Sequence, residues 1–407
     1  MYEDLKVFTD VIGYIQKDYV EETKSKDLVY GAIKGMLETL DPHSAFMPPN
    51  MYKEMQEETK GRFEGLGIEI TIKEGVLTVV SPIEDTPAFK AGILAGDQIV
   101  KIEGESTKNF TLMDSVKRLR GPRGSKVTIT IMREGSTKPR EFTLVREVIP
   151  VRSVRHELME KNYGYIRISQ FQEKTDGEFE KAMKALSEES KGNLKGLILD
   201  LRNNPGGLLD QAVKISDRFI DSGLIVSVEG RKEDQKIKFY AHPDGQLSRY
   251  PLVVLVNGGS ASGAEIVAGA IQDHGRGILL GTQTFGKGSV QTIIPLKDGS
   301  GLRLTTARYY TPNGRSIQAK GIVPDFIVKP IRPEEEKETV APKLPSEKDL
   351  ERHLIDVEKG AAKEKQKKEE TKKEEGKEKR PVDNQLERAM ELLKSWDVFK
   401  NIAKGSK

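Results

Sequence analysis

The sequence predicts a multidomain α/β protein of the α+β kind, with a helical start, a β-rich module and an alternating core. Apolar residues recur at helical spacing over residues 2–20 and 26–40. Short β-branched runs separated by glycine and charged turns occupy residues 62–148, and strands alternate with helices after that. A chain of 407 residues is too long for one compact core, which favours two or three domains.

Residues 1–58 are predicted to form a small helical N-terminal region. Its first apolar stripe consists of Leu5, Phe8, Ile12, Ile15 and Tyr19. Its second stripe consists of Val29, Ile33, Met36, Leu37 and Leu40. The stretch LDPHSAFMPP then ends the helical pattern.

Residues 59–148 are predicted to form a small β-rich module. The candidate strands are IEITI, LTVVS, QIVKI, VTITIM and REFTLV, and one helix fits between them at Leu112–Leu119. Residues 149–331 are predicted to form an α/β domain with a mostly parallel sheet covered by helices. Its candidate strands are YGYIRIS, KGLILDL, PLVVLV and GILLG, with helices near 175–190, 208–221 and 262–274.

The end of the chain is highly charged. Residues 332–381 hold too few apolar side chains to offset the entropy of ordering, so they are predicted to be a disordered linker. A solvated helix with i,i+4 ion pairs is the alternative. Residues 382–407 regain an apolar stripe, which predicts an amphipathic helix that docks or dimerises. The stripe consists of Leu386, Met390, Leu393 and Trp396.

Composition excludes several classes of function. The 66 basic and 63 acidic residues nearly balance, so no general attraction to nucleic acid or membrane is expected. The absence of cysteine excludes disulfides, Cys-ligated zinc and a thiol nucleophile. No apolar run reaches membrane-spanning length, and the start lacks the pattern of a signal peptide. The expected location is therefore the cytosol, unless an export signal is missing from this chain.

The stretch GTQTFGKGSV, residues 281–290, nearly matches the phosphate-binding loop G-x-x-x-x-G-K-[ST]. Gly288 stands where a hydroxyl would hold magnesium, and the following SVQTIIPL predicts a strand instead of a helix. Nucleotide binding is therefore not predicted, and Lys287 needs another explanation.

A turn that contains two serines, upstream of Lys287, offers an explanation for this lysine. The segment NGGSASGAEIV places Ser260 and Ser262 between a buried strand and a helix, whose free N–H groups suit a developing oxyanion. No histidine stands in a convincing position for a base, except that His242 is a weak candidate. Lysine is the known substitute. A free lysine has a pKa of about 10.4, so Lys287 needs burial to lose its proton near neutral pH. These arguments do not choose between the two serines.

The chain resembles the carboxy-terminal processing peptidases, also called tail-specific proteases. The resemblance covers residues 25–330 and includes six motifs in family order: LDPHSAFM, GLGI, DLRNNPGG, NGGSAS-x-x-EI, TFGKGSVQ and YYTPNGRSIQ-x-x-GI-x-PD. It implies a ClpP/crotonase-like protease core with an inserted PDZ domain, and neither metal, cofactor nor nucleotide. Family members usually work outside the cytoplasm, which implies the periplasm or cell envelope.

The resemblance also implies a Ser/Lys dyad. The matching positions are Ser262 as the nucleophile and Lys287 as its base, which leaves Ser260 as a turn serine. Gln291, four positions after the lysine, is implied to support it, although a solvent-facing strand glutamine is the alternative. Family members usually read SASAS where this chain has SASGA, and little effect is expected from Ala264.

An oxyanion hole is implied at two turns. Gly263, directly after the nucleophile, offers one N–H donor. The second donor is expected from Gly206 or Gly207 in NNPGG, which can serve at the same time as a helix-entry turn. Glu265, one turn into the helix, is expected to stabilise the helix dipole rather than to act as a catalytic acid.

The stretch GRFEGLGIEI resembles the carboxylate-binding loop of PDZ domains. Backbone N–H groups of such a turn bind a terminal carboxylate, and the next strand pairs with the peptide. Alone, the pattern fits a plain hairpin about as well. The turn consists of Gly65, Leu66, Gly67 and Ile68. Arg120, just past the predicted helix, is a candidate partner of the substrate carboxylate or of the protease body, against a solvated arginine.

The sequence therefore predicts a serine endopeptidase that captures the free C-termini of proteins and cleaves them through an acyl-enzyme. The alternative is a catalytically silent PDZ scaffold or adaptor that binds C-termini. Apolar stripes at both ends of the chain predict helical contacts between copies, as in a homodimer.

Overall fold

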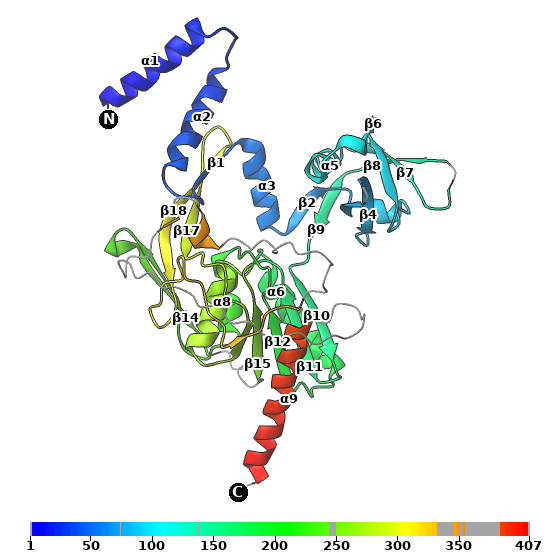
Figure 1. Ribbon diagram of the computed structural model, residues 1–407, viewed down its shortest axis with the longest axis vertical. Helices are drawn as coiled ribbons and strands as arrows, with labels where there is room; N and C mark the ends of the chain where they lie inside the picture. Colours follow the sequence, from blue (N-terminus) through cyan, green and yellow to red (C-terminus); the bar gives the residue numbers. More distant parts are fainter. Residues whose placement is uncertain are drawn as a thin grey trace, which may run out of the picture. The chain divides into compact units, whose positions relative to one another are not determined.

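The chain folds into two units. The structure is a computed structural model that describes residues 2–73, 75–136, 138–243, 250–331, 346–350, 353–354 and 383–405, with side chains up to 396 in the last range. One unit combines residues 1–53 with residues 153–407, and the other spans Glu54–Arg152 (Figure 1). The β-rich module is thus inserted in the sequence of the larger unit, as predicted, with boundaries a few residues outside 59–148.

A six-stranded sheet forms the centre of the larger unit. Its strand order is β10-β11-β12-β15-β16-β19, and all neighbours are parallel except β10 and β11. The strands are β10 Val154–Met159, β11 Tyr163–Ile168, β12 Gly196–Asp200, β15 Leu252–Val256, β16 Ile278–Gly281 and β19 Phe326–Ile327. The mostly parallel sheet predicted from the alternating pattern is confirmed.

Helices cover both faces of this sheet. Leu197 and Leu199 of β12 share a core with α6 (Thr175–Glu189), α7 (Leu209–Asp217) and α8 (Gly263–Asp273). Ile198 of the same strand packs with the C-terminal helix α9 (Asn384–Gly405) instead. Because successive side chains of a strand point to opposite faces, α9 lies on the face away from the other three helices.

The apolar stripe of α9 is therefore used within its own chain. Ala389, Met390 and Leu393 are buried against the central sheet, while Trp396 stays 55% exposed. Arg202, at the end of β12, anchors the start of the helix through Asp383, with an Nη2–Oδ2 distance of 2.7 Å. Of the two predicted roles, docking is the one this helix fulfils in the structure.

A second sheet joins distant parts of the larger unit. Its order is β1-β18-β13-β14, with β17 also paired to β18. The strands are β1 Ala45–Met47, β13 Gly223–Gly230, β14 Lys236–Ala241, β17 Ser289–Pro295 and β18 Gly301–Tyr310. Of these strands the sequence predicted only β17.

The N-terminal helices form close to their predicted bounds, as α1 (Tyr2–Asp18) and α2 (Ser25–Glu38), and α3 (Pro49–Thr59) follows unpredicted. The LDPHS segment connects this region to β18 through hydrogen bonds. The Asp41 carboxylate accepts hydrogen bonds from the N–H groups of His43 and Ser44 and from the Thr305 hydroxyl. Since β1 also pairs with β18, residues up to 53 belong to the larger unit.

The inserted unit is built on a sheet of order β3-β4-β5-β7-β8. Its strands are β3 Ile68–Lys73, β4 Val76–Pro82, β5 Gln98–Ile102, β7 Lys126–Met132 and β8 Arg140–Val145, with the short β6 Glu105–Ser106 beside β5 and a separate pair of β2 Arg62–Gly65 with β9 Glu147–Pro150. Its described residues also include the helices α4 (Pro87–Lys90) and α5 (Leu112–Leu119). Within the described residues β3 pairs only with β4, so its other edge is open.

Most of the predicted linker, residues 332–381, lies outside the described residues. Residues 346–350 and 353–354 are described, and the first of these ranges contains a 3₁₀ turn, Glu347–Asp349, whose first residue is fully buried. The prediction of disorder is therefore wrong for this short segment.

Candidate active site

Ser262 lies at the sharp turn between β15 and α8. Its backbone angles are φ 53° and ψ −112°, in a region that residues other than glycine rarely adopt. The turn places the residue at the cap of α8, where the first N–H groups of the helix have no helical partner. Its side chain is only 7% exposed. The Ala264 and Glu265 N–H groups donate to carbonyls of the turn, so among the described residues the Gly263 N–H is the donor left beside the Ser262 hydroxyl.

Ser260 has a different role in the same turn. It is fully buried, its Oγ accepts the Asn257 N–H at 3.0 Å, and its hydroxyl donates to the Leu201 carbonyl at 2.8 Å. The Ser260 hydroxyl therefore acts as both a donor and an acceptor, and these two hydrogen bonds hold the turn against the end of β12. The geometry agrees with the turn role expected for Ser260 and leaves Ser262 as the available hydroxyl.

The NNPGG turn packs directly against the serine turn. The N–H of Ala261 donates to the Asn204 carbonyl at 2.9 Å. Gly206 is so close that an added Cβ would lie 2.8 Å from the Ser262 Cβ. Any side chain at position 206 would therefore displace the serine turn.

The two glycines of this turn differ as oxyanion donors. The Gly206 N–H already donates to Asn204 Oδ1 at 2.8 Å, so the donor expected there is engaged. Among the described residues, neither the Gly207 N–H nor the Gly263 N–H has a hydrogen-bond partner. The arrangement therefore favours Gly207 over Gly206 as the companion of Gly263.

Lys287 lies in the loop between β16 and β17. Gly286 has φ 98°, and a Cβ at Gly288 would lie 2.4 Å from the backbone N of Gln318. The lysine is half-buried, and this burial lowers its pKa, with the positive charge of Arg303 adding to the effect. The negative charges of Glu347, Glu265 and Asp41 oppose it.

Glu265 connects the serine turn to the lysine loop. Its carboxylate accepts hydrogen bonds from the Ser262 N–H at 2.9 Å, the Gly286 N–H at 2.8 Å, the Lys287 N–H at 2.9 Å and the Thr284 hydroxyl at 2.5 Å. It is fully buried, and burial raises its pKa to about 7 against the lowering effect of these donors. One carboxylate thus fixes both segments, a role beyond the helix-dipole stabilisation expected for it.

The side chains of the predicted dyad are not bonded to each other in this structure. Within the described residues no hydrogen bond joins Ser262 Oγ to Lys287 Nζ. Tyr309 lies beside the Ser262 side chain, and burial raises the pKa of Tyr309 to about 12 against a lowering effect of Ser262. Catalytic hydrogen bonds are often long before substrate binds, so this geometry does not exclude the pair.

Among the described residues no hydrogen bond joins Gln291 to the Lys287 side chain either. Its amide nitrogen donates to the Ser289 hydroxyl at 2.9 Å and to the Thr305 hydroxyl at 3.4 Å. A bulge between Val290 and Gln291 shifts the register of β17 against β18, so regular alternation along the strand does not decide which way Gln291 points. Its predicted support of the lysine remains a prediction.

The GLGI turn of the inserted unit lies beside Arg120. Gly67 has φ 77°, and a Cβ there would lie 2.3 Å from the Thr86 Cβ. The Leu66 and Gly67 carbonyls accept hydrogen bonds from within the unit. A Cβ at Gly65 would lie 3.8 Å from the Arg120 Cα. The Arg120 guanidinium stacks 4.9 Å from the Phe63 ring centre and lies 3.8 Å from Glu58.

Known families match three parts of the chain. Residues 162–328 match peptidase family S41, residues 65–144 a PDZ domain and residues 1–50 the N-terminal domain of the activating protease CtpB. The chain is 49% identical over 337 residues to the carboxy-terminal-processing protease of Bartonella bacilliformis, covering 83% of this chain and 77% of that one. The chain belongs to the carboxy-terminal processing proteases of peptidase family S41.

The chain is also similar to further processing proteases. The protease is 38% identical over 323 residues to the carboxyl-terminal-processing protease of a Synechocystis species, covering 77% of this chain and 74% of that one. A solved structure, the photosystem II D1 C-terminal processing protease, has 32% sequence identity and a TM-score of 0.48, covering 79% of this chain and 86% of that one. The protein is a serine-type peptidase with a PDZ domain, as predicted.

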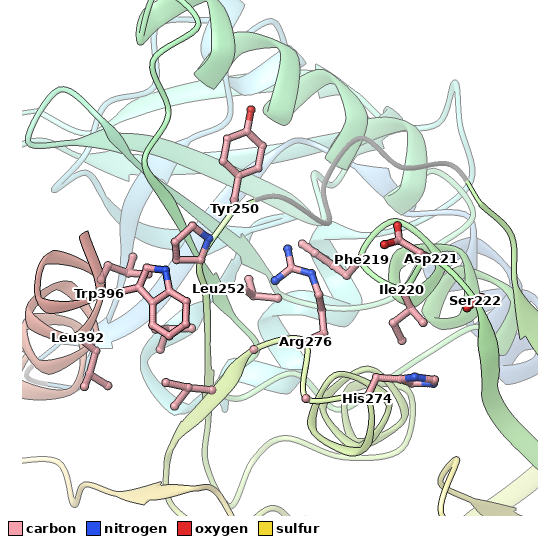
Figure 2. A pocket seen from close by; sticks show the side chains of 16 residues that line it. Phe219, Ile220, Asp221, Ser222, Tyr250, Leu252, His274, Arg276, Leu392 and Trp396 are labelled. Carbon is pink, nitrogen blue, oxygen red and sulfur yellow. The ribbon is translucent and has the colours of Figure 1, made fainter. Parts of the chain in front are cut away.

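A cavity of about 650 Å³ lies elsewhere in the protease unit (Figure 2). Arg276 lies among its lining side chains, 5.9 Å from the Phe219 ring centre, and Trp396 of α9 borders it. None of the predicted catalytic residues lines this cavity.

No helix among the described residues has the length and apolar character needed to span a membrane.

Sequence reasoning missed several residues that surround Lys287 and Ser262. Tyr309 stands within the quoted motif YYTPNG, so its position could have drawn attention. Arg303 and Asp41 act on the lysine through charge, and Asp41 also lies in a quoted motif. Glu347 had no such signal, since it lies in the charged segment predicted to be disordered.

Proposed function

We propose that this protease cleaves peptide bonds with Ser262 as nucleophile and Lys287 as general base. The observation that carries the proposal is the buried Glu265 carboxylate, which accepts backbone N–H groups from both segments. A strained serine at a helix start and a lysine whose pKa burial lowers are thereby held in one site. The direct test is alanine replacement of each of the two residues.

The proposed reaction proceeds through these residues. Neutral Lys287 removes the hydroxyl proton of Ser262 as Oγ attacks the scissile carbonyl carbon. The Gly207 and Gly263 N–H groups stabilise the oxyanion of the tetrahedral intermediate. Lys287 then protonates the leaving amine as the C–N bond breaks. Water, deprotonated by the same lysine, hydrolyses the resulting acyl-enzyme and restores Ser262.

We propose that the PDZ domain captures the free C-terminus of the substrate protein. The open edge of β3 supports this role, because an extended peptide can add to it as a further strand. The N–H groups of the turn from Gly65 to Ile68 would bind the terminal carboxylate. The Arg120 backbone lies next to Gly65, and its guanidinium, which lies against Phe63 and Glu58, would supply positive charge to the bound carboxylate.

Amidation of the substrate C-terminus is expected to reduce cleavage roughly 10-fold or more, because a charged hydrogen bond contributes about 1.5–3 kcal/mol. The measurement is mass spectrometry of the products from paired peptides with free and amidated ends. An Arg120→Ala variant should lose part of this discrimination, whereas Arg140→Ala, an exposed arginine on β8 of the same domain, should keep it. Equal cleavage of both peptides would contradict tail capture.

The rate of cleavage is expected to rise with pH through an apparent pKa below about 10.4, the value of a free lysine. The sign follows from burial, which lowers the pKa of Lys287 and so lets the active neutral form appear at lower pH. The measurement is kcat/KM against pH. A Glu265→Gln variant separates any step near pH 7 that arises from Glu265, whose pKa is raised to about 7. A rate still climbing at the free-lysine pKa would mean that Lys287 is not the base.

We propose that copies of the chain associate through α1. No described residue of this helix is buried, although Phe8, Val11 and Tyr14 are among its large apolar side chains. Removing residues 2–18 is expected to convert an associated protein to monomer in sedimentation velocity. Removal of α9 would be a poor test, because its apolar face completes the central core. An unchanged association state without residues 2–18 would exclude this contact.

We also propose an extracytoplasmic location, in the periplasm or cell envelope, as the resemblance to tail-specific proteases implies. Fractionation of cells that express the natural gene tests this, and recovery solely with cytosolic markers would count against it.

A further inference from the structure

Glu347 is a fully buried carboxylate contributed by a short segment that is distant in sequence from the rest of the site. Its oxygens each lie 2.8 Å from His43 Nε2, and one also accepts the Gln318 side-chain amide at 2.8 Å. The Glu347 backbone N–H donates to the Phe285 carbonyl at 3.1 Å. The residue therefore contacts the LDPHS turn, the segment after β18 and the lysine loop at once.

These contacts hold the lysine loop from both sides. Phe285, bonded to the Glu347 backbone, precedes Lys287 by two positions. On the other side, the Gly288 N–H donates at 3.0 Å to Gln318 Oε1, and the amide nitrogen of that glutamine is held by Glu347. Gln318 is itself fully buried, so its hydrogen bonds to Gly288 and Glu347 are shielded from solvent.

Burial of a carboxylate is costly unless the charge is paired and its oxygens are hydrogen bonded. A segment that served only to cover the lysine loop could do so with an apolar side chain. A charged one adds a fixed negative potential near Lys287 as well as directional hydrogen bonds. Arg303, Glu265 and Asp41 are the other charged groups that act on the lysine, and only Arg303 is positive.

We propose that Glu347 is a positioning residue for the reaction, which orients the Lys287 loop through Phe285 and Gln318 and balances the positive charge of Arg303. This inference rests on the proposed role of Lys287 as base. It assigns the 346–350 segment to the catalytic unit of the protease. It also gives the LDPHS turn a function, because His43 holds the carboxylate in place.

The test compares Glu347→Ala and Glu347→Gln with the full-length protein on a fluorogenic peptide and on casein. Glu347→Ala is expected to lower kcat about 10- to 100-fold with KM within about twofold, because a small misplacement of a catalytic group has effects of this size. Glu347→Gln keeps an acceptor for Gln318 and should recover most of kcat. Because the Glu347 charge raises the pKa of Lys287, its removal should shift the acid limb of kcat/KM to lower pH.

Lys348→Ala is the matched control, since it removes one charge from an exposed neighbour in the same turn and should match the wild type. Thermal unfolding of each variant shows whether it still folds. If Glu347→Ala fails to fold, the kcat and the acid limb of Glu347→Gln decide whether the inference holds. Wild-type kcat and an unshifted acid limb in Glu347→Gln, or wild-type kcat in a folded Glu347→Ala, would overturn the inference. If Lys287→Ala also cleaves normally, the proposed dyad has failed rather than the role of Glu347.

Discussion

Replacing Ser262 or Lys287 with alanine is expected to lower cleavage by roughly 10³- to 10⁶-fold, and the double variant should be no worse than either single one. Catalytic residues that act as a unit behave in this non-additive way, because either loss removes the whole covalent path. The remaining rate would come from oxyanion donors and binding alone. The measurement is kcat/KM for a fluorogenic peptide in the two single variants and the double variant.

Ser260→Ala is the matched control for this experiment, because it removes a hydroxyl two residues away. Its hydrogen bonds to Asn257 and Leu201 would be lost, so a lower melting temperature is expected, but cleavage should persist. Inactivity of Ser260→Ala together with activity of Ser262→Ala would mean that the wrong serine was chosen. If the wild-type chain fails to cleave under any condition, the silent PDZ scaffold becomes the better explanation.

Elements with local signals were predicted closely from the sequence. The helix expected at Leu112–Leu119 forms with those bounds, because Thr111 and Asp114 cap its start within the same short stretch. The buried strands of the central sheet are near-continuous apolar runs, which identify them without their neighbours. β18 escaped prediction because most of its residues are only partly buried and two of its strand partners, β1 and β13, are distant in sequence, as in the pairing of Ala45 with Arg303.

The candidate site likewise combines segments that have local sequence signals with contacts between residues that are distant in sequence. The serine turn and the lysine loop have recognisable local patterns, and the family resemblance selects Ser262 over Ser260. What joins the two segments is not local, since Glu265 reaches the Gly286 N–H across 21 positions and His43 reaches Glu347 across 304. Glu347 also lies in a stretch whose composition indicates disorder, and average composition cannot reveal one buried charge.

Replacing Gly288 with serine is expected to lower cleavage about 100-fold, because a catalytic lysine displaced by about 1 Å loses that much rate. A Cβ at this position would lie 2.4 Å from the Gln318 backbone N, and backbone cannot rotate away as a side chain can. The crowding should also lower the free energy of unfolding by about 1–3 kcal/mol. The measurements are kcat and urea denaturation of the variant.

Gly177→Ser is the control, since a Cβ at that helical glycine meets no atom within 4 Å. Serine at 288 would complete the sequence pattern of a phosphate loop, G-x-x-x-x-G-K-S, while closing the space in which Gly288 lies against Gln318. The variant should therefore lose protease activity without gaining a thermal shift from MgATP. Normal cleavage by Gly288→Ser would show that the lysine loop tolerates this displacement, and the link from Gly288 through Gln318 to Glu347 would then lose its importance as well.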